Sequence, residues 1–171
     1  LLLLLNSPGG SVLDGALIVS AIEAAGVPVY TVCMQLCASM AAIIHQYGTQ
    51  RLMLDRSILM FHDAAGGVNG YFPHIRAQFD AVDRYVNKFN FYISRRSNVK
   101  YDDWIATVHK NLWIDAEDAV SQHFADNMVY VKVIVNGKNL DLRSLIYPSR
   151  KLRNTVIQPS VNPYTIFDTN L

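Results

Sequence analysis

The sequence predicts an α/β fold with a largely parallel sheet. Short apolar, β-branched runs alternate with segments of helical periodicity in the first third of the chain, an order typical of parallel βαβ units. The chain has 171 residues, 51% of them hydrophobic, which is enough to bury one substantial core. We therefore expect one domain over residues 1–135 and a C-terminal extension over residues 136–171.

The first elements are defined by apolar pattern and by stop signals. Leu1–Leu5 is a short apolar run ended by Pro8 and Gly9, which is typical of a strand buried on both faces. The pattern then predicts a helix over Val12–Ala25, a strand over Val29–Cys33, a helix over Ala38–Tyr47, and strands over Arg51–Leu54 and Ile58–Phe61.

The chain changes character after His62. Residues 63–70 are rich in glycine and predict an extended or flexible segment. A long amphipathic and aromatic helix is expected from Pro73 to about Ser94, and a helix of this length is expected to meet another subunit with part of its surface. The remaining predicted elements are helices over Asp102–Lys110 and Asp115–Phe124, a strand over Met128–Val135 and a hairpin turn at Asn136-Gly137.

Composition argues against several classes of partner. The net charge is +1, so no strong field attracts nucleic acid or an anionic membrane. No apolar run is long enough for a membrane helix, and the leading leucines lack the basic region of a signal peptide. Cys33 and Cys37 have no further metal ligands close in sequence, so we expect no metal site and two small buried side chains in a reducing compartment.

Two strand-to-helix junctions hold the candidate chemistry. Gly9-Gly10 follows the first strand and Ser39-Met40 follows the second, so their backbone amides can converge on one developing negative charge, as an oxyanion hole requires. A serine at the start of a helix is commonly only an N-cap. His62, however, ends a neighbouring strand at the same edge, and a serine with a histidine there favours nucleophilic catalysis.

The stretches NSPGGSVLDG, ASMAA and MFHDAAGG resemble, in this order, the motifs of ClpP, the proteolytic subunit of Clp protease. The resemblance covers residues 1–135 and implies a serine endopeptidase with the ClpP/crotonase-like βαβ spiral, a protruding handle segment over residues 63–98 and no cofactor. By position it implies the following roles: Ser39 as nucleophile, His62 as general base, the amides of Gly10 and Met40 as the oxyanion hole, and Gly66 and Gly67 in the segment that binds a peptide substrate.

The resemblance also implies partners and a location. Members of the family form stacked rings that enclose a chamber, so we expect a homo-oligomer that hydrolyses peptides or unfolded proteins. An ATP-driven AAA+ unfoldase is the implied partner and the cytoplasm the implied compartment. The chain departs from the family at Gln35 and Leu36, where a glycine and a polar residue are usual, and its extension after Val135 has no counterpart.

The third catalytic position is the departure with the largest consequence. The family has an aspartate where this chain has Asn111, whose amide oxygen can still orient the histidine but brings no charge. Three interpretations stay open. Asn111 serves as a weaker orienter of the histidine, or Asp115 or Asp103 replaces it after a local shift. In the third, the subunit is slow or inactive and works in a mixed ring. Two other readings stay open: a phage-type protease that matures capsids, and a crotonase-like acyl-CoA enzyme.

Overall fold

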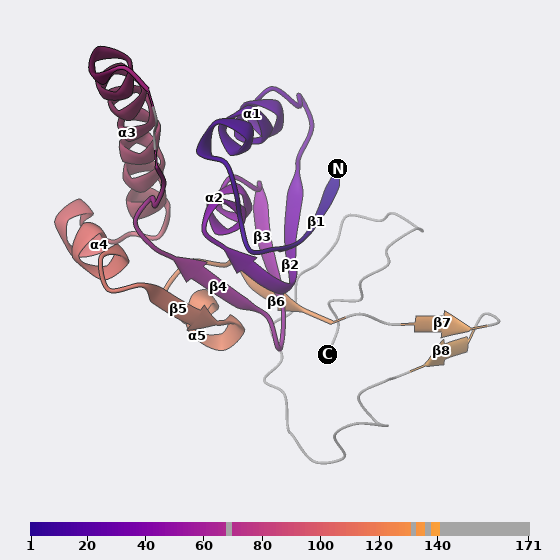
Figure 1. Cartoon of the computed structure of the whole chain (residues 1–171). Helices are drawn as coiled ribbons and strands as arrows, with labels where there is room; N and C mark the ends of the chain where they lie inside the picture. Colours follow the sequence, from indigo (N-terminus) through magenta and orange to yellow (C-terminus); the bar gives the residue numbers. More distant parts are fainter. Residues whose placement is uncertain (68–69, 131–132, 136–137, 141–171) are drawn as a thin grey trace.

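The protein, seen here in a computed structural model, is described over residues 1–67, 70–130, 133–135 and 138–140. It has the predicted α/β class (Figure 1). The elements, in chain order, are β1 (Leu2–Ser7), α1 (Val12–Glu23), β2 (Tyr30–Ala38), α2 (Met40–Gln46), β3 (Gln50–Leu54), β4 (Ile58–Phe61), α3 (Phe72–Arg96), α4 (Tyr101–Val108), β5 (Leu112–Asp115), α5 (Ala116–Ser121), β6 (Asn127–Val129), β7 (Val133–Val135) and β8 (Lys138–Leu140).

A six-stranded sheet organises the domain around β2. Its order is β5-β4-β2-β3-β6, and β1 also pairs with β2. Every pair is parallel except the pair of β4 with β5. The first half of β2 (30–33) pairs with β3 and its second half (36–38) pairs with β4, so the strand passes from one neighbour to the next.

A bulge in β2 makes this change of neighbour possible. Leu5 lies opposite Cys33 and Ser7 lies opposite Cys37, so two steps along β1 match four along β2. The side-chain oxygen of Asn6 accepts a hydrogen bond of 3.1 Å from the Leu36 amide within the bulge. The prediction ended this strand at Cys33 and was wrong there, because the bulge hides the regular alternation of the strand.

The helices begin at recognisable signals and pack close to the sheet. Ser11 caps α1 by accepting a 3.3 Å hydrogen bond from the Asp14 amide. Helix α1 packs on α2, and a side chain at Gly15 would collide with Met40, since an added Cβ would lie 2.2 Å from its Cγ. Helix α2 in turn contacts β1, β2 and β4, which fixes the start of this helix at the end of β2.

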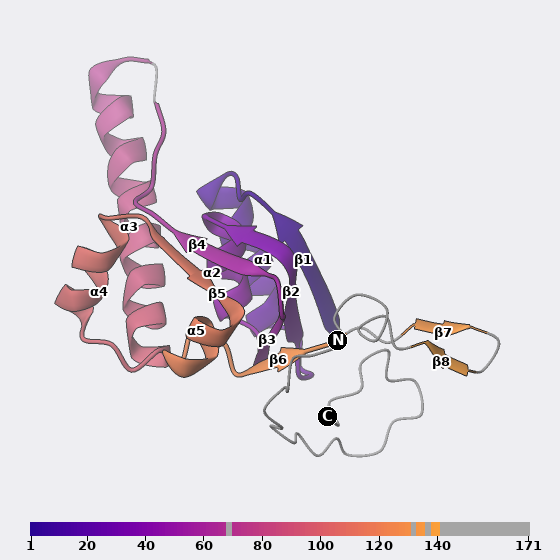
Figure 2. The ribbon, with the colours of Figure 1, turned by 90° about the horizontal axis from the view of Figure 1, so that it is seen from below.

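Helix α3 projects from the rest of the domain (Figure 1, Figure 2). It has 25 residues, and Phe89 and Ile93 near its C-terminal end are buried. Towards its other end, the side chains of Phe72 and Phe79 are 85% and 63% exposed. The chain alone therefore leaves part of this aromatic surface uncovered, as the sequence led us to expect.

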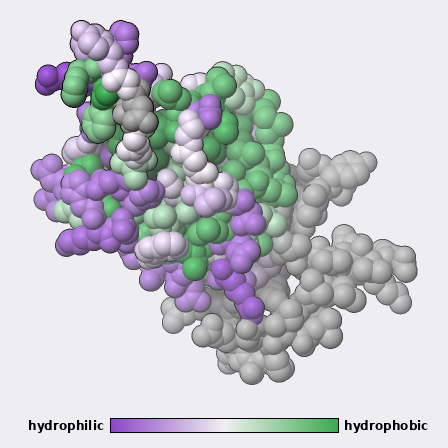
Figure 3. Space-filling view, in the orientation of Figure 1, coloured by the Kyte–Doolittle hydropathy of each residue, from purple (hydrophilic) through white to green (hydrophobic). Residues whose placement is uncertain are grey.

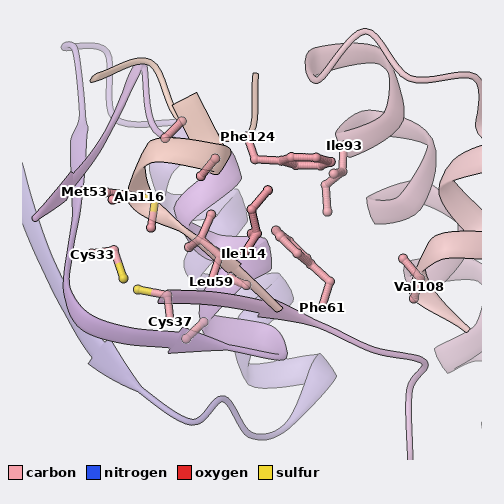
Figure 4. Packing of buried hydrophobic residues seen from close by; sticks show 14 of the residues in the cluster. Cys33, Cys37, Met53, Leu59, Phe61, Ile93, Val108, Ile114, Ala116 and Phe124 are labelled. Atoms are coloured by element: carbon pink, nitrogen blue, oxygen red, sulfur yellow. The ribbon is translucent and has the colours of Figure 1, made fainter. Parts of the chain in front are cut away.

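The main core lies between the sheet, α2, α4 and α5 (Figure 4). Cys33 and Cys37 are free and fully buried in it, which confirms their prediction as small core residues. Phe61, Trp104 and Phe124 pack their rings together with centroid separations of 5.2 to 5.7 Å. This aromatic cluster supports the end of β4 immediately before His62.

A partly buried ion pair joins β3 to the segment before β6. Arg51 is 3% exposed, and its guanidinium donates to both carboxylate oxygens of Asp126, at 3.2 and 2.6 Å. The same group donates to the Gln46 side chain at 2.9 Å and to the His123 carbonyl at 2.8 Å. Because the partners come from α2 and from the segment before β6, the pair ties these parts of the fold to β3.

The C-terminal part differs in detail from the predicted elements. The predicted strand over Met128–Val135 is divided into β6 and β7, and β5 was not predicted at all. Strands β7 and β8 pair antiparallel with Val135 opposite Lys138, as a hairpin requires. The predicted turn residues 136–137 and the extension from residue 141 lie outside the described residues.

Candidate active site

Ser39 lies at a sharp strand-to-helix turn between β2 and α2. Its backbone has φ 56° and ψ −125°, a conformation that non-glycine residues rarely adopt and that is typical of an exposed nucleophile. The Ser39 amide donates to the Met60 carbonyl on β4 at 2.8 Å, and its carbonyl accepts from the Ile43 amide at 3.1 Å. The turn is thus held by the sheet on one side and by the helix on the other.

The hydroxyl of Ser39 points to His62. Serine Oγ and imidazole Nε2 lie 2.8 Å apart, and the Ser39 side chain makes no capping hydrogen bond to α2. Ser39 therefore does not act as an ordinary side-chain N-cap. A serine hydroxyl within hydrogen-bond reach of an imidazole is the arrangement in which the imidazole can accept the hydroxyl proton.

Backbone amides surround the Ser39 turn. Within the described part of the chain, the amides of Gly10 and Met40 donate to no protein acceptor. Gly9 has φ 101°, and an added Cβ there would lie 2.9 Å from the Met40 nitrogen and 2.7 Å from Ser39 Cβ. The glycine turn consequently lies directly against the Ser39 junction, close enough for unpaired amides from both segments to approach one atom.

Comparison with known proteins identifies the family. A sequence model of Clp protease matches residues 1–132. The chain is 30% identical over 134 residues to ATP-dependent Clp protease proteolytic subunit 1 of Prochlorococcus marinus subsp. pastoris, covering 77% of this chain and 68% of the relative. It is 33% identical over 129 residues to proteolytic subunit 1 of a Synechococcus species, covering 74% and 66%, respectively. The chain belongs to the Clp protease family.

A further relative agrees with this assignment. Proteolytic subunit 2 of Parasynechococcus marenigrum is 32% identical over 129 residues, which cover 74% of this chain and 66% of the relative. The family membership confirms the resemblance on which the sequence analysis relied and is consistent with a serine-type endopeptidase. The matched region thus spans about two thirds of each of these relatives.

The third catalytic position of the Clp protease family lies near His62 without a bond to it. Strands β4 and β5 pair up to Phe61 opposite Leu112, so one further step brings His62 opposite Asn111. Asn111 is exposed, has φ 58°, and in the described structure its side chain makes no hydrogen bond to the imidazole. Its role as an orienter of the histidine stays a prediction.

The two carboxylates considered as substitutes for the family aspartate lie elsewhere. Asp115 pairs with Ile58, at the opposite end of the β4–β5 ladder from His62, and its side chain caps α5 by accepting from the Asp118 amide at 2.9 Å. Asp103 lies in the first turn of α4. Within the described residues, the imidazole of His62 is hydrogen-bonded to neither carboxylate.

A pocket opens beside the serine and the histidine. The pocket is shallow and open to solvent. The wall is mainly apolar and comes from the start of α1, the Ser39 turn and α2, the end of β4 and the residues after it, the inner end of α3, and α4. It is formed by Val12, Ser39, Met40, Ile43, Phe61, His62, Ala64, Val86, Phe89, Asn90, Ile93, Trp104 and Val108. Its lining beside the nucleophile is therefore chemically suited to apolar groups.

The segment after His62 contains the predicted substrate-binding glycines and one contact that was not predicted. Gly66 and Gly67 are exposed, and an added Cβ at either would meet no atom within 4 Å. Asp63 accepts a 2.5 Å hydrogen bond from Nδ1 of His109 at the end of α4. No short motif signals this contact, because its two residues are 46 positions apart.

Among the described residues, no helix combines the length and the apolar character that crossing a membrane demands.

Proposed function

We propose that this chain is a serine-type endopeptidase of the ClpP type. The observation that carries the proposal is the 2.8 Å contact between Ser39 Oγ and His62 Nε2 at a turn where the hydroxyl serves no cap. Family membership supports the same reaction class.

The chemistry follows from the atoms at the turn. His62 Nε2 accepts the Ser39 proton while Oγ attacks the peptide carbonyl, and the amides of Gly10 and Met40 donate to the oxygen that becomes negative. The imidazolium then gives its proton to the leaving amine, which leaves an acyl group on Ser39. Water, deprotonated by His62, attacks this ester and releases the second product. Asn111 is proposed to orient the imidazole through its amide oxygen.

The proposed substrate is an extended peptide or an unfolded protein. The exposed backbone at Gly66 and Gly67 has room for a neighbouring extended strand, and the apolar pocket beside Ser39 suits an apolar side chain next to the cleaved bond.

The proposed assembly is a pair of stacked rings in the cytoplasm, fed by an AAA+ unfoldase. Two exposed surfaces support association: the aromatic face of α3, and the apolar surface over α1 and β1 in Figure 3. Apolar side chains of this second surface that are exposed are Leu2, Leu4, Leu13, Leu17 and Ile18.

Active-site labelling tests the proposed catalysis. A fluorophosphonate should label the purified protein once per chain, and Ser39→Ala should abolish both labelling and peptidase activity. Ser121→Ala is the matched control, because in the described part of the chain this exposed hydroxyl bonds only within α5, to the Asp118 carbonyl at 3.0 Å. Peptidase activity retained by Ser39→Ala would exclude the mechanism, and native mass measurement of the same sample tests the rings.

The second candidate is a ring subunit with weak or no activity. The side chain of Asn111 is uncharged and, among the described residues, makes no hydrogen bond to the His62 imidazole. This favours the second candidate, because loss of the charged orienter lowers kcat by roughly 10⁴ in a well-studied serine protease. The absence of a burst with an activated ester, both alone and mixed with an active Clp subunit, would support this candidate.

A further inference from the structure

Asp63 and His109 join the residue after His62 to the end of α4. Nδ1 of His109 donates to an Asp63 carboxylate oxygen at 2.5 Å. Both side chains are more than half exposed, at 54% for Asp63 and 60% for His109. In the described structure, this contact is the one hydrogen bond that either side chain makes. It joins the segment after β4 to the end of α4.

His62 lies between two contacts that join β4 and the residues after it to neighbouring elements. On one side of His62, the backbone ladder of β4 and β5 ends with Phe61 opposite Leu112. On the other side, Asp63 meets His109. The segment beyond, over residues 63–67, belongs to no helix or strand and is exposed. Within residues 63–67 of the described structure, the Asp63–His109 contact is therefore the last side-chain hydrogen bond.

The histidine needs such a tie because its own ring is held at one atom. Among the described residues, Ser39 is the one hydrogen-bond partner of the His62 imidazole. In a serine protease, a third side chain normally fixes the orientation and tautomer of the ring. Asn111 makes no such bond here, so the backbone at the end of β4 has to determine where the ring points.

We infer that Asp63 and His109 are positioning residues for His62: their contact holds the end of β4 against the start of β5 and keeps the imidazole in line with Ser39. The inference rests on the proposed function, because it concerns the efficiency of the same serine and histidine. Neither side chain touches the hydroxyl, and neither takes part in the proton transfer.

The size of the effect is bounded by the strength of the contact. A solvent-exposed contact between a histidine and a carboxylate contributes little free energy, and it can bias the position of His62 by no more than that free energy. Removing it should therefore lower kcat by about two- to fivefold. KM should stay constant, since the substrate pocket does not include Asp63 or His109.

A double-mutant cycle with an activated ester substrate tests the inference. Asp63→Ala and His109→Ala should each lower kcat by about two- to fivefold, and the double variant should be no slower than the slower single variant. Asp63→Asn keeps an oxygen acceptor for His109 and should restore most of the rate. Asp55→Ala, which removes an exposed carboxylate in the turn before β4, is the matched control and should leave kcat unchanged.

Several results would overturn the inference. They are unchanged kcat in both single variants, effects that add in the double variant, an equal loss in Asp55→Ala, or a change confined to KM. Fluorophosphonate labelling of each sample distinguishes a failure of the proposed function from a failure of this inference alone. If the wild-type protein is not labelled at Ser39, the proposed function fails and the inference fails with it. If Ser39 is labelled but the Asp63 and His109 variants react at the wild-type rate, only the inference fails.

Discussion

The His45 side chain in α2 is fully buried, and this burial predicts a loss of stability in acid. Nε2 lies 3.0 Å from the Leu52 carbonyl and donates to it, and Nδ1 accepts from the Gln46 side chain at 3.3 Å. Burial lowers the pKa of His45 from 6.5 to about 4, more than the hydrogen bond to Leu52 raises it. The imidazole is therefore neutral in the folded protein at neutral pH.

The sign and the magnitude follow from proton linkage. The unfolded chain takes up a proton at this residue near pH 6.5, whereas the folded chain does so only near pH 4, so acid favours unfolding within this window. His45 should thus lower the free energy of unfolding by about 2 kcal/mol between about pH 7 and about pH 5. Asp126 does not titrate within this pH window. Burial raises the pKa of its carboxyl group, but the hydrogen bonds and the charge of Arg51 outweigh burial and keep this pKa below 3.8.

Urea unfolding of the wild type and of His45→Gln measures the contribution of His45 to the free energy of unfolding at each pH. The glutamine side chain can still donate to the Leu52 carbonyl but does not titrate. Tryptophan fluorescence, which combines Trp104 (1% exposed) with the exposed Trp113, reports the loss of the core through its change at Trp104. Between about pH 7 and about pH 5, the wild type should lose about 2 kcal/mol more than the variant. The reasoning is refuted if both proteins lose the same free energy with the same dependence on urea.

Three further substitutions give distinct expected results. Gly9→Ala forces a Cβ to within 2.7 Å of Ser39 Cβ at φ 101°, so it should destabilise the fold by about 2 kcal/mol and lower fluorophosphonate labelling at least about tenfold. Arg51→Met leaves the Asp126 carboxylate without its buried partner and should cost about 2–3 kcal/mol in urea unfolding, discounted because Asp126 is 27% exposed. Asn111→Asp restores a charged orienter opposite the imidazole and should raise kcat about tenfold or more, whereas an unchanged kcat would show that this position does not reach the ring.

The local pattern was enough to predict most of the elements but not their long-range pairing. The helix of α1 and the strands β3 and β4 were predicted because apolar spacing and stop signals are local properties. Strand β5 was missed because its four residues (LWID) lie between two helices and are stabilised by antiparallel pairing with β4, about fifty residues earlier. The extension of β2 to Ala38 was missed because it depends on a bulge and on a change of partner strand.

In the candidate site, too, some contacts could be predicted from the sequence and others depend on long-range packing. The Ser39 and His62 pair could be predicted, because each ends a parallel strand and the ends of neighbouring parallel strands meet at one edge of a sheet. The contact of Asp63 with His109 could not, because it joins two ordinary polar residues through the placement of α4 beside β4. For the same reason, sequence position alone could not show that Asp115 lies at the opposite end of the β4–β5 ladder from His62.

The two halves of the site are held in different ways, and this difference predicts where activity is most easily lost. The positive φ of Ser39 costs about 1–3 kcal/mol. Such strain persists only where several surrounding contacts hold the backbone in place. Here the surroundings are rigid: the Ser39 amide bonds to β4, Gly9 packs against the turn, and Met40 is 3% exposed in the core. His62 instead stands at the open end of β4, held by one ring contact and a short ladder. Mild changes around the histidine should therefore reduce catalysis while the fold stays intact, whereas changes around the serine should reduce stability and catalysis together.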